Sequence, residues 1–373
     1  MPVKKRVVIS VINDLNSDQR VHKMALFIQK QGYDVLLVGR VKKDSAPMES
    51  RPYQTKRFKL IAEKGALFYA VYNWRLFWFL LFQKADILVS NDLDTLLANF
   101  VCSKMKGILL VYDSHEYFTE VPELIHRPRI QRIWEKIEGY IFPKLTTIIT
   151  VNRSIAEKYK QKYGKDLIVV RNCSPLWKAR NIPSKQALGI PENKFIIIMQ
   201  GAGLNIDRGV EEAIEAIATI PDVVLLIVGH GDVIPEMEKK VKAAHWDNIF
   251  FFGKKPYNEL LCYTYHADLG LSLDKPTNPN YLFSLPNKVF DYLHTGTPIL
   301  ASNVVEVAAL IQKHDIGQTI SEVTTEQIRN AINNMQQKPE LLERWKYNCL
   351  QAAQVENWEH EVSQLTEIYP TQK

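Results

Sequence analysis

Short apolar runs alternate along the chain with segments whose apolar residues recur at helical spacing. The continuous apolar run at 7–12 is typical of a parallel strand that helices cover on both faces. Val21, Met24 and Ile28 follow it at helical spacing, and Gly32 ends that segment. Further strands are expected at 35–38, 87–90, 109–112, 148–151 and 167–170. This alternation predicts a doubly wound α/β sheet.

A second strand and helix series follows a proline-containing segment, 171–191, which shows neither period and suits a linker between domains. This second series predicts a helix at 210–217 and strands at 195–199, 223–228, 249–252, 269–273 and 298–301. The sequence therefore predicts two α/β domains, 1–175 and 176–355, and a C-terminal helix in 356–373 that packs back on the first domain. Ligands of such sheets bind beyond the carboxyl ends of the strands, so we expect the ligand in a cleft between the two domains.

Composition places the chain among ordinary globular proteins, with 46% hydrophobic and 24% charged residues. The net charge of +6 permits an anionic partner without identifying one. The basic residues are scattered and match no nucleic-acid-binding motif, so nucleic acid is not an expected partner. The cysteines lie far apart without a CxxC pair, which predicts buried free thiols in a reducing, cytoplasmic compartment.

The most apolar segment, 66–82, is shorter than the roughly 20 residues that a membrane span needs, and Arg75 lies in its middle. We expect a helix with Trp74, Trp78 and Phe82 on one face. Tyr, Trp and Arg suit a membrane surface, whereas an ordinary core helix with a solvated Arg75 would show the same pattern. Both interpretations remain open at the level of sequence.

The first predicted strand does not lead into a GxGxxG loop, and no Walker A motif is present, which disfavours an ordinary dinucleotide-dependent dehydrogenase. The second half is more informative, because Gly201 and Gly203 follow a strand and Arg208 immediately precedes a helix. Glycines allow close backbone approach, a helix N-terminus favours an anion, and arginine can clamp a phosphate. The alternative is a tight turn with a solvated arginine. Gly229 and His230 form a second glycine loop after the next strand.

The segment 280–302 carries the strongest signal for a nucleotide site. Leu285 and Pro286 open a helix whose N-terminal amides would suit a diphosphate. Asn287, Asp291 and His294 share one face of that helix, and Asp291 is placed to accept hydrogen bonds from vicinal hydroxyls such as those of a ribose. The alternative is a capped amphipathic helix with a solvated aspartate.

Several motifs together make the chain similar to the family 4 glycosyltransferases. SLPNKVFDYLHTGTPILAS resembles the donor-site signature of that family, and QGAGLNIDRGVEEAI resembles its phosphate-binding segment. NDLDTLLA and VYDSHEYF in the first half are also similar, and the resemblance spans nearly the whole chain. It implies the GT-B fold, two Rossmann-like domains facing a central cleft, and a retaining transferase whose donor is a nucleotide sugar, with UDP- or GDP-sugars expected.

The resemblance also implies roles for individual residues. His115 and Arg208 would act at the reacting centre, with Arg208 stabilising the donor diphosphate and Asp291 holding the ribose. The first domain, 1–175, would face the acceptor, and the second, 176–355, would bind the donor. The remaining donor-binding residues would be Gly201, Gly203, Gly229, His230, Gly253, Lys254, Leu285, Pro286, Asn287 and Lys288. The residues on the acceptor side would be Asn13, Asp92, Asp94 and Glu116.

The chain departs from the family pattern at two positions. The family often has two glutamates separated by seven residues; Asp291 takes the place of the second and Phe283 that of the first. Ala202 replaces a basic residue six places before Arg208. The resemblance implies no metal ion and no cofactor beyond the donor. Asp92 and Asp94 do have the spacing of a metal-binding DxD motif, but we expect them in an acceptor-side loop.

The acceptor is expected to be a lipid-linked sugar or a glycan in polysaccharide or glycoconjugate assembly. Contact of 66–82 with the inner face of the plasma membrane would fit, aided by Lys56, Arg57 and Lys59 and by the basic residues in 127–132. Two other functions share the expected fold: a nucleotide-sugar 2-epimerase, and a catalytically silent nucleotide-sugar-binding protein.

Overall fold

The computed structural model describes residues 4–16, 18–43, 45, 47–48 and 50–372. The chain divides into two compact units, one formed by Met1–Arg171 with Val362–Lys373 and the other by Asn172–Glu361. The second unit thus begins four residues before the domain start expected from the sequence.

The first unit is built on a parallel sheet in which the described residues form seven strands, ordered β3-β2-β1-β4-β5-β6-β7. The strands are β1 (Arg6–Asp14), β2 (Asp34–Val41), β3 (Gln54–Lys59), β4 (Ile87–Asn91), β5 (Leu109–Ser114), β6 (Thr147–Thr150) and β7 (Ile168–Val169). The strand order reverses between β1 and β4, which pair in parallel from Val7 opposite Ile87 to Ser10 opposite Ser90. Ligands of open α/β sheets bind beyond the carboxyl ends of the strands at such a reversal.

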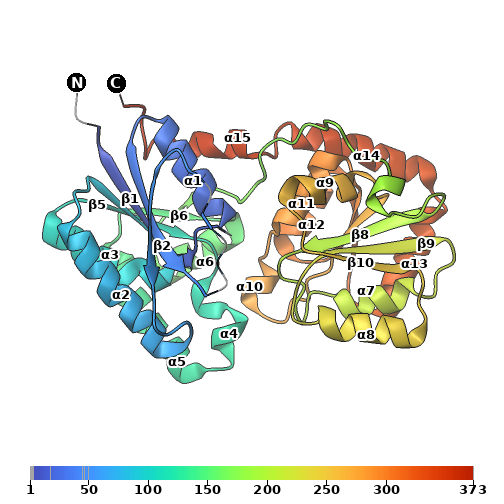
Figure 1. Ribbon diagram of the computed structural model, residues 1–373, viewed down its shortest axis with the longest axis horizontal. Helices are drawn as coiled ribbons and strands as arrows, with labels where there is room; N and C mark the ends of the chain where they lie inside the picture. The colour runs from blue at the N-terminus through green and yellow to red at the C-terminus, as the bar shows by residue number, and fades with distance from the viewer. Residues whose placement is uncertain (1–3, 17, 44, 46, 49, 373) are drawn as a thin grey trace. The chain divides into compact units, whose positions relative to one another are not determined.

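Helices cover both faces of this sheet (Figure 1). They are α1 (Gln19–Lys30), α2 (Gly65–Phe82), α3 (Leu93–Lys106), α4 (Pro122–Ile125), α5 (Pro128–Ile141) and α6 (Arg153–Tyr163), with short 3-10 turns at Phe118–Glu120 and Phe142–Lys144. Asp18 caps α1 by accepting a hydrogen bond from the Val21 amide at 3.1 Å. α2 packs beside α3, so the predicted apolar helix at 66–82 is present.

The second unit repeats this architecture, with six strands among the described residues ordered β10-β9-β8-β11-β12-β13. The strands are β8 (Phe195–Gly201), β9 (Val223–Gly229), β10 (Ile249–Gly253), β11 (Leu269–Ser272), β12 (Ile299–Ser302) and β13 (Gly317–Ile320). The helices are α7 (Val210–Ile217), α8 (Ile234–Ala244), α9 (Tyr257–Tyr265), α10 (Pro279–Leu282), α11 (Asn287–Thr295), α12 (Val305–His314), α13 (Thr325–Gln336), α14 (Pro339–Ala353) and α15 (Trp358–Glu361), with a 3-10 turn at Gln186–Leu188. Here the order reverses between β8 and β11.

Two apolar clusters, one on each face of this sheet, form the core of the second unit. Ile197 and Met199 of β8 pack with residues of α7, α8 and α13, whereas Ile196 and Ile198 pack with residues of α9, α11, α12 and α14. Figure 1 shows these two sets of helices on opposite faces of the sheet. Burial on both faces explains why the strand sequences are continuously apolar. The predicted α/β class is therefore confirmed.

Two strands, β3 and β13, were not predicted because each is short and largely polar. In β3 only Phe58 is buried, and in β13 only Ile320 is buried, so neither shows a continuous apolar run. Both lie at an edge of their sheet, where one side is not covered by another strand. The basic residues Lys56, Arg57 and Lys59 therefore lie in an edge strand and not in the loop that leads into α2.

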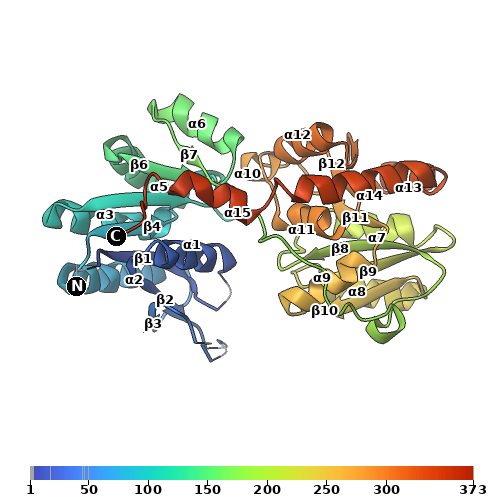
Figure 2. The ribbon, with the colours of Figure 1, turned by 90° about the horizontal axis from the view of Figure 1, so that it is seen from above.

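The C-terminal segment is shared between the units. α15 lies in the second unit, and the 3-10 turn Val362–Leu365 begins the piece that belongs to the first. That piece lies beside α1 (Figure 2), where the Gln372 amide donates to the Gln31 carbonyl oxygen at 2.8 Å. Tyr369 is fully buried there, with its ring 6.1 Å from that of Tyr33. None of the helices in the described part of the chain could span a bilayer.

Candidate active site

Two polar sites lie at the strand-order reversals, one in each unit. The site of the second unit starts from two glycine loops at the carboxyl ends of β8 and β9. The His230 amide donates to the Gly201 carbonyl oxygen, and the Leu204 amide donates to the His230 carbonyl oxygen, both at 3.1 Å. A Cβ at Gly231 would lie only 1.9 Å from the Leu204 carbonyl oxygen. The two loops therefore pack backbone to backbone, which a side chain at 231 would prevent.

Arg208 lies in the turn between β8 and α7 and forms an ion pair with Asp274, which follows β11. Nη1 of Arg208 lies 2.5 Å from Oδ2 of Asp274, and the guanidinium stacks 4.0 Å from the ring centre of Tyr281. Asp274 is 1% exposed and Arg208 is 25% exposed, so the guanidinium reaches solvent while its partner does not. The sequence predicted Arg208 but gave no signal for Asp274 or Tyr281.

The start of α11 faces the same carboxylate. The Ser284 hydroxyl donates to Oδ2 of Asp274 at 3.1 Å. Lys288, in the first turn of α11, interacts electrostatically with both Asp274 and Arg208. Burial lowers the pKa of the Lys288 amine, Asp274 opposes this, and Arg208 adds to it. In the described structure no side chain caps α11, whose N-cap residue is Pro286. Two cations and a helix N-terminus thus surround one buried carboxylate, an arrangement that attracts an anion.

Asp291 lies deeper, on the buried side of α11. It is 4% exposed, and it accepts hydrogen bonds from Ser174 and Tyr257 on Oδ1, both at 2.7 Å, and from Gln200 on Oδ2 at 3.0 Å. Burial and this carboxylate raise the pKa of Tyr257. A ribose hydroxyl could reach Asp291 only by sharing or replacing one of these contacts. Ser174 and Tyr257 carried no recognisable signal in the sequence, and Gln200 was part of the segment similar to the family's phosphate-binding segment without a role of its own.

The other predicted donor-site residues differ in burial. The helix face expected to carry Asn287, Asp291 and His294 is split, because Asn287 is exposed whereas His294 is buried against the Glu356 carbonyl oxygen at 3.1 Å. Burial lowers the pKa of His294. Gly203, His230 and Lys254 are exposed beyond the ends of β8, β9 and β10, and Gly253 is exposed as the last residue of β10. Leu285 and Pro286 are half-buried just before α11.

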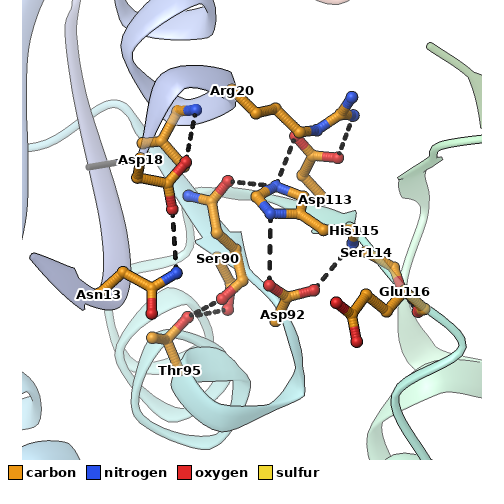
Figure 3. A network of polar contacts seen from close by, with 12 residues as sticks. Asn13, Asp18, Arg20, Ser90, Asp92, Thr95, Asp113, Ser114, His115 and Glu116 are labelled. Carbon is orange, nitrogen blue, oxygen red and sulfur yellow. Dashed lines mark hydrogen bonds and ion pairs between the residues drawn. The ribbon is translucent and has the colours of Figure 1, made fainter. Parts of the chain in front are cut away.

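The site of the first unit is a polar network around His115, at the carboxyl ends of β4 and β5 (Figure 3). Nδ1 of His115 lies 3.3 Å from Oδ2 of Asp92, and Nε2 lies 3.1 Å from Oδ1 of Asn91 and 3.4 Å from Oδ2 of Asp113. Behind the histidine, Nη2 of Arg20 donates to Oδ1 of Asp113 at 2.8 Å. The sequence indicated His115 and Asp92 but missed Arg20, Asn91 and Asp113.

The charges of this network shift one another's pKa values. Burial alone would lower the pKa of His115, but Asp92 and Asp113 outweigh burial and raise it to about 9. Burial would raise the pKa of Asp113, but Arg20 and then His115 hold it well below its usual range. Burial raises the pKa of Asp92, an effect that His115 opposes. Both carboxylates therefore favour the charged form of the histidine.

The remaining acceptor-side predictions lie around this network. Asp94, in the first turn of α3, is 7% exposed, and burial followed by Asp92 raises its pKa well above the usual range. Asn13 is exposed and donates to Oδ2 of Asp18 at 3.0 Å, and Glu116 is exposed after β5. Within the described residues, no group of three or more His, Cys, Asp or Glu side chains could hold a metal ion.

The comparisons with known proteins match both halves of the chain. Residues 18–174 match the family described as Glycosyltransferase Family 4, and residues 181–351 match the family described as Glycosyl transferases group 1. No curated protein sequence matches the chain closely enough to be called a relative.

Solved structures with the same fold cover almost all of the chain. A sucrose-phosphate synthase from Thermosynechococcus elongatus matches with a TM-score of 0.80 at 16% identity, over 98% of each chain. Anabaena HepE in complex with UDP-glucose matches with a TM-score of 0.73 at 16% identity, over 97% of this chain and 98% of that one. WaaG, a glycosyltransferase involved in lipopolysaccharide biosynthesis, matches with a TM-score of 0.71 at 16% identity, over 98% and 100%. Together with the two family matches, this fold identifies the chain as a family 4 glycosyltransferase with the GT-B architecture.

Proposed function

We propose that the protein transfers a sugar from a nucleoside diphosphate sugar with retention of anomeric configuration. The observation that carries the proposal is the cationic site around Asp274, where Arg208, Lys288 and the uncapped start of α11 face one place. Two cations against one carboxylate leave a net positive charge, which suits a diphosphate. HepE is described in complex with UDP and with UDP-glucose, which supports a UDP-sugar ahead of a GDP-sugar.

In this proposal the protein stabilises the leaving diphosphate. Negative charge develops on the diphosphate as the sugar–phosphate bond breaks, and a guanidinium already fixed by Asp274 stabilises that charge without reorganising. The amides at the start of α11 would add to this effect, and Asp291 with Tyr257 would meet the ribose. The family resemblance gives His115 a role beside the donor sugar and requires neither a metal ion nor another cofactor. The donor phosphate would take the proton of the acceptor hydroxyl.

The acceptor proposed is a lipid-linked sugar or a glycan, in polysaccharide or glycoconjugate assembly. α2 supports a lipid-linked acceptor, because Trp74, Trp78 and Phe82 are 64%, 42% and 78% exposed on its outer face. Their rings contact one another in sequence at 5.6 and 6.1 Å, so they form a continuous apolar strip, hereafter the aromatic strip. The role of WaaG in lipopolysaccharide biosynthesis fits the same proposal.

Basic residues supply the charge that an anionic membrane surface would attract. Arg127, Arg129 and Arg132 are exposed at the start of α5, in the same unit as the aromatic strip. Arg57 contributes less than its sequence position suggested, because it lies 3.6 Å from Asp14 in an ion pair. We therefore propose peripheral contact with the inner face of the plasma membrane through α2, with the arginines of α5 providing electrostatic attraction.

Product analysis tests the function. The chain is incubated with a panel of UDP- and GDP-sugars and a polyprenyl-diphosphate-linked sugar, and the glycosidic linkage of the product is read by NMR from its anomeric coupling. Retention is the expected result. Inversion would contradict the proposed mechanism, and failure to transfer from every donor would contradict the assigned reaction.

A catalytically silent nucleotide-sugar-binding protein is a second candidate, favoured by Phe283 and Ala202 at positions where the family often has functional side chains. Slow hydrolysis of the donor without an acceptor would speak against that candidate. Conversion of the donor to its 2-epimer without an acceptor would instead identify an epimerase.

Flotation with vesicles of phosphatidylglycerol and phosphatidylcholine tests the membrane contact. The variant Trp74→Ser/Trp78→Ser/Phe82→Ser should lose at least tenfold in vesicle-bound fraction. Tyr347→Ser, on the 63% exposed Tyr347 of α14, is the matched control and should bind as the wild type does. Equal binding of the triple variant would rule out the aromatic strip as the contact.

A further inference from the structure

A buried ion pair in the first unit has no part in the function proposed so far. Arg20 and Asp113 are 3% and 0% exposed, and Nη2 of Arg20 lies 2.8 Å from Oδ1 of Asp113. A buried pair of charges gives up much hydration, and apolar side chains of similar volume often replace such a pair without loss of stability. Its position directly behind His115 points to a role in the site (Figure 3).

The His115 ring has an oxygen acceptor beside each of its nitrogens. Asn91 faces Nε2 with its oxygen, because its own Nδ2 donates to the Ser10 carbonyl oxygen at 2.9 Å. A carbonyl oxygen only accepts hydrogen bonds, so this contact fixes the orientation of the amide. Nε2 must therefore carry a hydrogen, whichever tautomer the ring would otherwise adopt.

The second ring nitrogen faces the carboxylate of Asp92. Oδ2 of Asp92 lies 3.3 Å from Nδ1, and Oδ1 of Asp92 accepts the backbone amide of His115 at 2.8 Å. A hydrogen bond from an amide favours the charged form of a carboxylate. Toward the ionised form of Asp92, Nδ1 also donates, and a ring that donates from both nitrogens is an imidazolium.

Arg20 fixes the second carboxylate that faces the ring. Its Nη2 holds Oδ1 of Asp113, and its Nη1 donates to the Val170 carbonyl oxygen at 2.8 Å. Oδ2 of Asp113 is left directed at Nε2 of His115, at 3.4 Å. With both amino groups engaged, the guanidinium cannot rotate away, so the carboxylate keeps its orientation toward the ring.

We infer that Asp113, clamped by Arg20, is a positioning residue that keeps the His115 ring doubly protonated, so that His115 serves the reaction as a fixed cation and not as a base. This inference rests on the proposed function, in which His115 lies beside the donor sugar. A charged imidazole cannot take the proton of the acceptor hydroxyl, which agrees with a reaction in which the donor phosphate takes it. The cation instead stabilises negative charge on the departing group or on a sugar oxygen.

The charged groups around the ring support a protonated state. Arg20 of α1 pairs with Asp113 of β5, and His115 lies beside both Asp113 and Asp92, the residue before α3. Further out, Asp18 raises the pKa of Asp92, and Arg40 lowers and Glu116 raises the pKa of Asp94. Asp113 raises the pKa of Tyr369. The two adjacent carboxylates outweigh burial and raise the pKa of His115 to about 9.

The titration of His115 in the full chain tests this inference directly. The protein is labelled with ¹⁵N-histidine, the signal of His115 is assigned by its loss in His115→Gln, and the midpoint is read from ring nitrogen shifts between pH 5 and 10. The wild type should titrate near pH 9. In Asp113→Asn the midpoint should fall by at least one pH unit, because the carboxylate that stabilises the cation is gone.

Asp113→Asn leaves Arg20 buried without its anion and could fail to fold. The double variant Arg20→Gln/Asp113→Asn replaces both charged side chains by neutral ones of similar shape. Its midpoint should also fall, but by less than in Asp113→Asn, because the Arg20 charge that lowers the pKa of His115 is removed as well. Glu138→Gln is the matched control, because Glu138 is a fully buried carboxylate of the same unit whose described partners are Lys162, Tyr159 and Tyr163. It should leave the midpoint of His115 unchanged.

The pH profile of kcat/KM for sugar transfer supplies the second readout. Its alkaline limb should move to lower pH in step with the His115 midpoint, a shift that a purely structural role of Asp113 would not produce. A wild-type midpoint near 6.5, or a midpoint unchanged in both variants, would overturn the inference. If His115 titrates as expected but no nucleotide sugar supports transfer, the proposed function fails and the protonation of His115 stands.

Discussion

Single residues show where sequence reasoning succeeds and where it stops. Arg208 was predicted because it lies between a strand and a helix, in a local pattern. Its partner Asp274 lies 66 positions away and becomes a neighbour only because β8 and β11 are adjacent in the sheet. Strand order is not visible in hydrophobic periodicity, so the ion pair could not be predicted. Arg20 and Asp113 were missed for the same reason, since 93 positions separate them.

Two substitutions of Arg208 distinguish the effect of its positive charge from that of its planar guanidinium. Arg208→Lys keeps a cation beside Asp274 but loses the planar guanidinium, so we expect turnover to fall at least tenfold with a nearly unchanged melting temperature. Arg208→Ala leaves Asp274 buried without its cation, which should lower the free energy of unfolding by about 2–4 kcal/mol as well. Steady-state kinetics and thermal denaturation of both variants test this. Wild-type turnover in Arg208→Lys would remove the guanidinium from the mechanism.

The raised pKa of His115 predicts how stability depends on pH. A group whose pKa is higher in the folded than in the unfolded state stabilises the fold fully below its unfolded pKa, about 6.5 for histidine. That contribution is lost as the pH rises through the folded value of about 9. Urea denaturation between pH 6 and 9.5 should therefore show a decline in the free energy of unfolding that His115→Gln reduces. An equal decline in the variant would contradict the assignment.

Among the elements, α2 differs most from an ordinary amphipathic helix. Phe68, Tyr72, Leu76 and Leu80 are buried at four-residue spacing, and the opposite face carries the aromatic strip. Core packing and an exposed apolar face are therefore both present. The interpretation as a core helix therefore describes the buried face, whereas contact of the exposed face with a membrane stays a prediction.

Substitutions on the two faces of α2 should change the free energy of unfolding by different amounts. Leu76→Ala removes a fully buried side chain and should lower the free energy of unfolding by about 2–5 kcal/mol. Trp78→Ser on the aromatic strip should change stability by less than about 1 kcal/mol, because that side chain is 42% exposed. Chemical denaturation measures both. A large loss of stability in Trp78→Ser would mean that the aromatic strip supports the fold.

The loops after β8 and β9 pack so closely that position 231 must be glycine. Gly231→Ala would place a methyl group on the Leu204 carbonyl oxygen and push the β8–α7 loop, which carries Arg208, out of place. We expect at least a tenfold weaker affinity for a nucleoside diphosphate by calorimetry. Gly139→Ala, where a Cβ has no neighbour within 4 Å, is the control and should leave that affinity unchanged. Equal affinities would show that the glycine loops do not shape the donor site.

At the scale of the whole molecule, the alternation of strands and helices was sufficient to predict the α/β class and its repetition. The division of the C-terminal segment was harder to foresee, because 356–373 shows no feature that marks the change of unit after Glu361. Leu365 and Tyr369 are buried in the first unit, so the last residues complete a core that begins with β1. That completion depends on contacts over more than 300 positions, which no local pattern reveals.

Tyr369 tests whether the C-terminal segment stabilises the first unit. Tyr369→Ala should lower the free energy of unfolding by about 3–5 kcal/mol, since a fully buried aromatic ring is lost. Tyr369→Phe should be neutral or slightly stabilising, because the buried hydroxyl has no hydrogen-bond partner among the described residues. Thermal denaturation compares the two. A Tyr369→Ala variant as stable as the wild type would exclude a structural role.

We propose that one diphosphate binds where Arg208, Lys288 and the start of α11 surround Asp274. Calorimetric titration with UDP and GDP, on the wild type and on Arg208→Lys, tests it most directly. We expect the wild type to bind at least one of the two nucleotides and Arg208→Lys to bind it at least tenfold more weakly, while the control Glu138→Gln binds it as the wild type does. Absence of binding to both nucleotides, or equal affinity in Arg208→Lys, would contradict the proposed donor site.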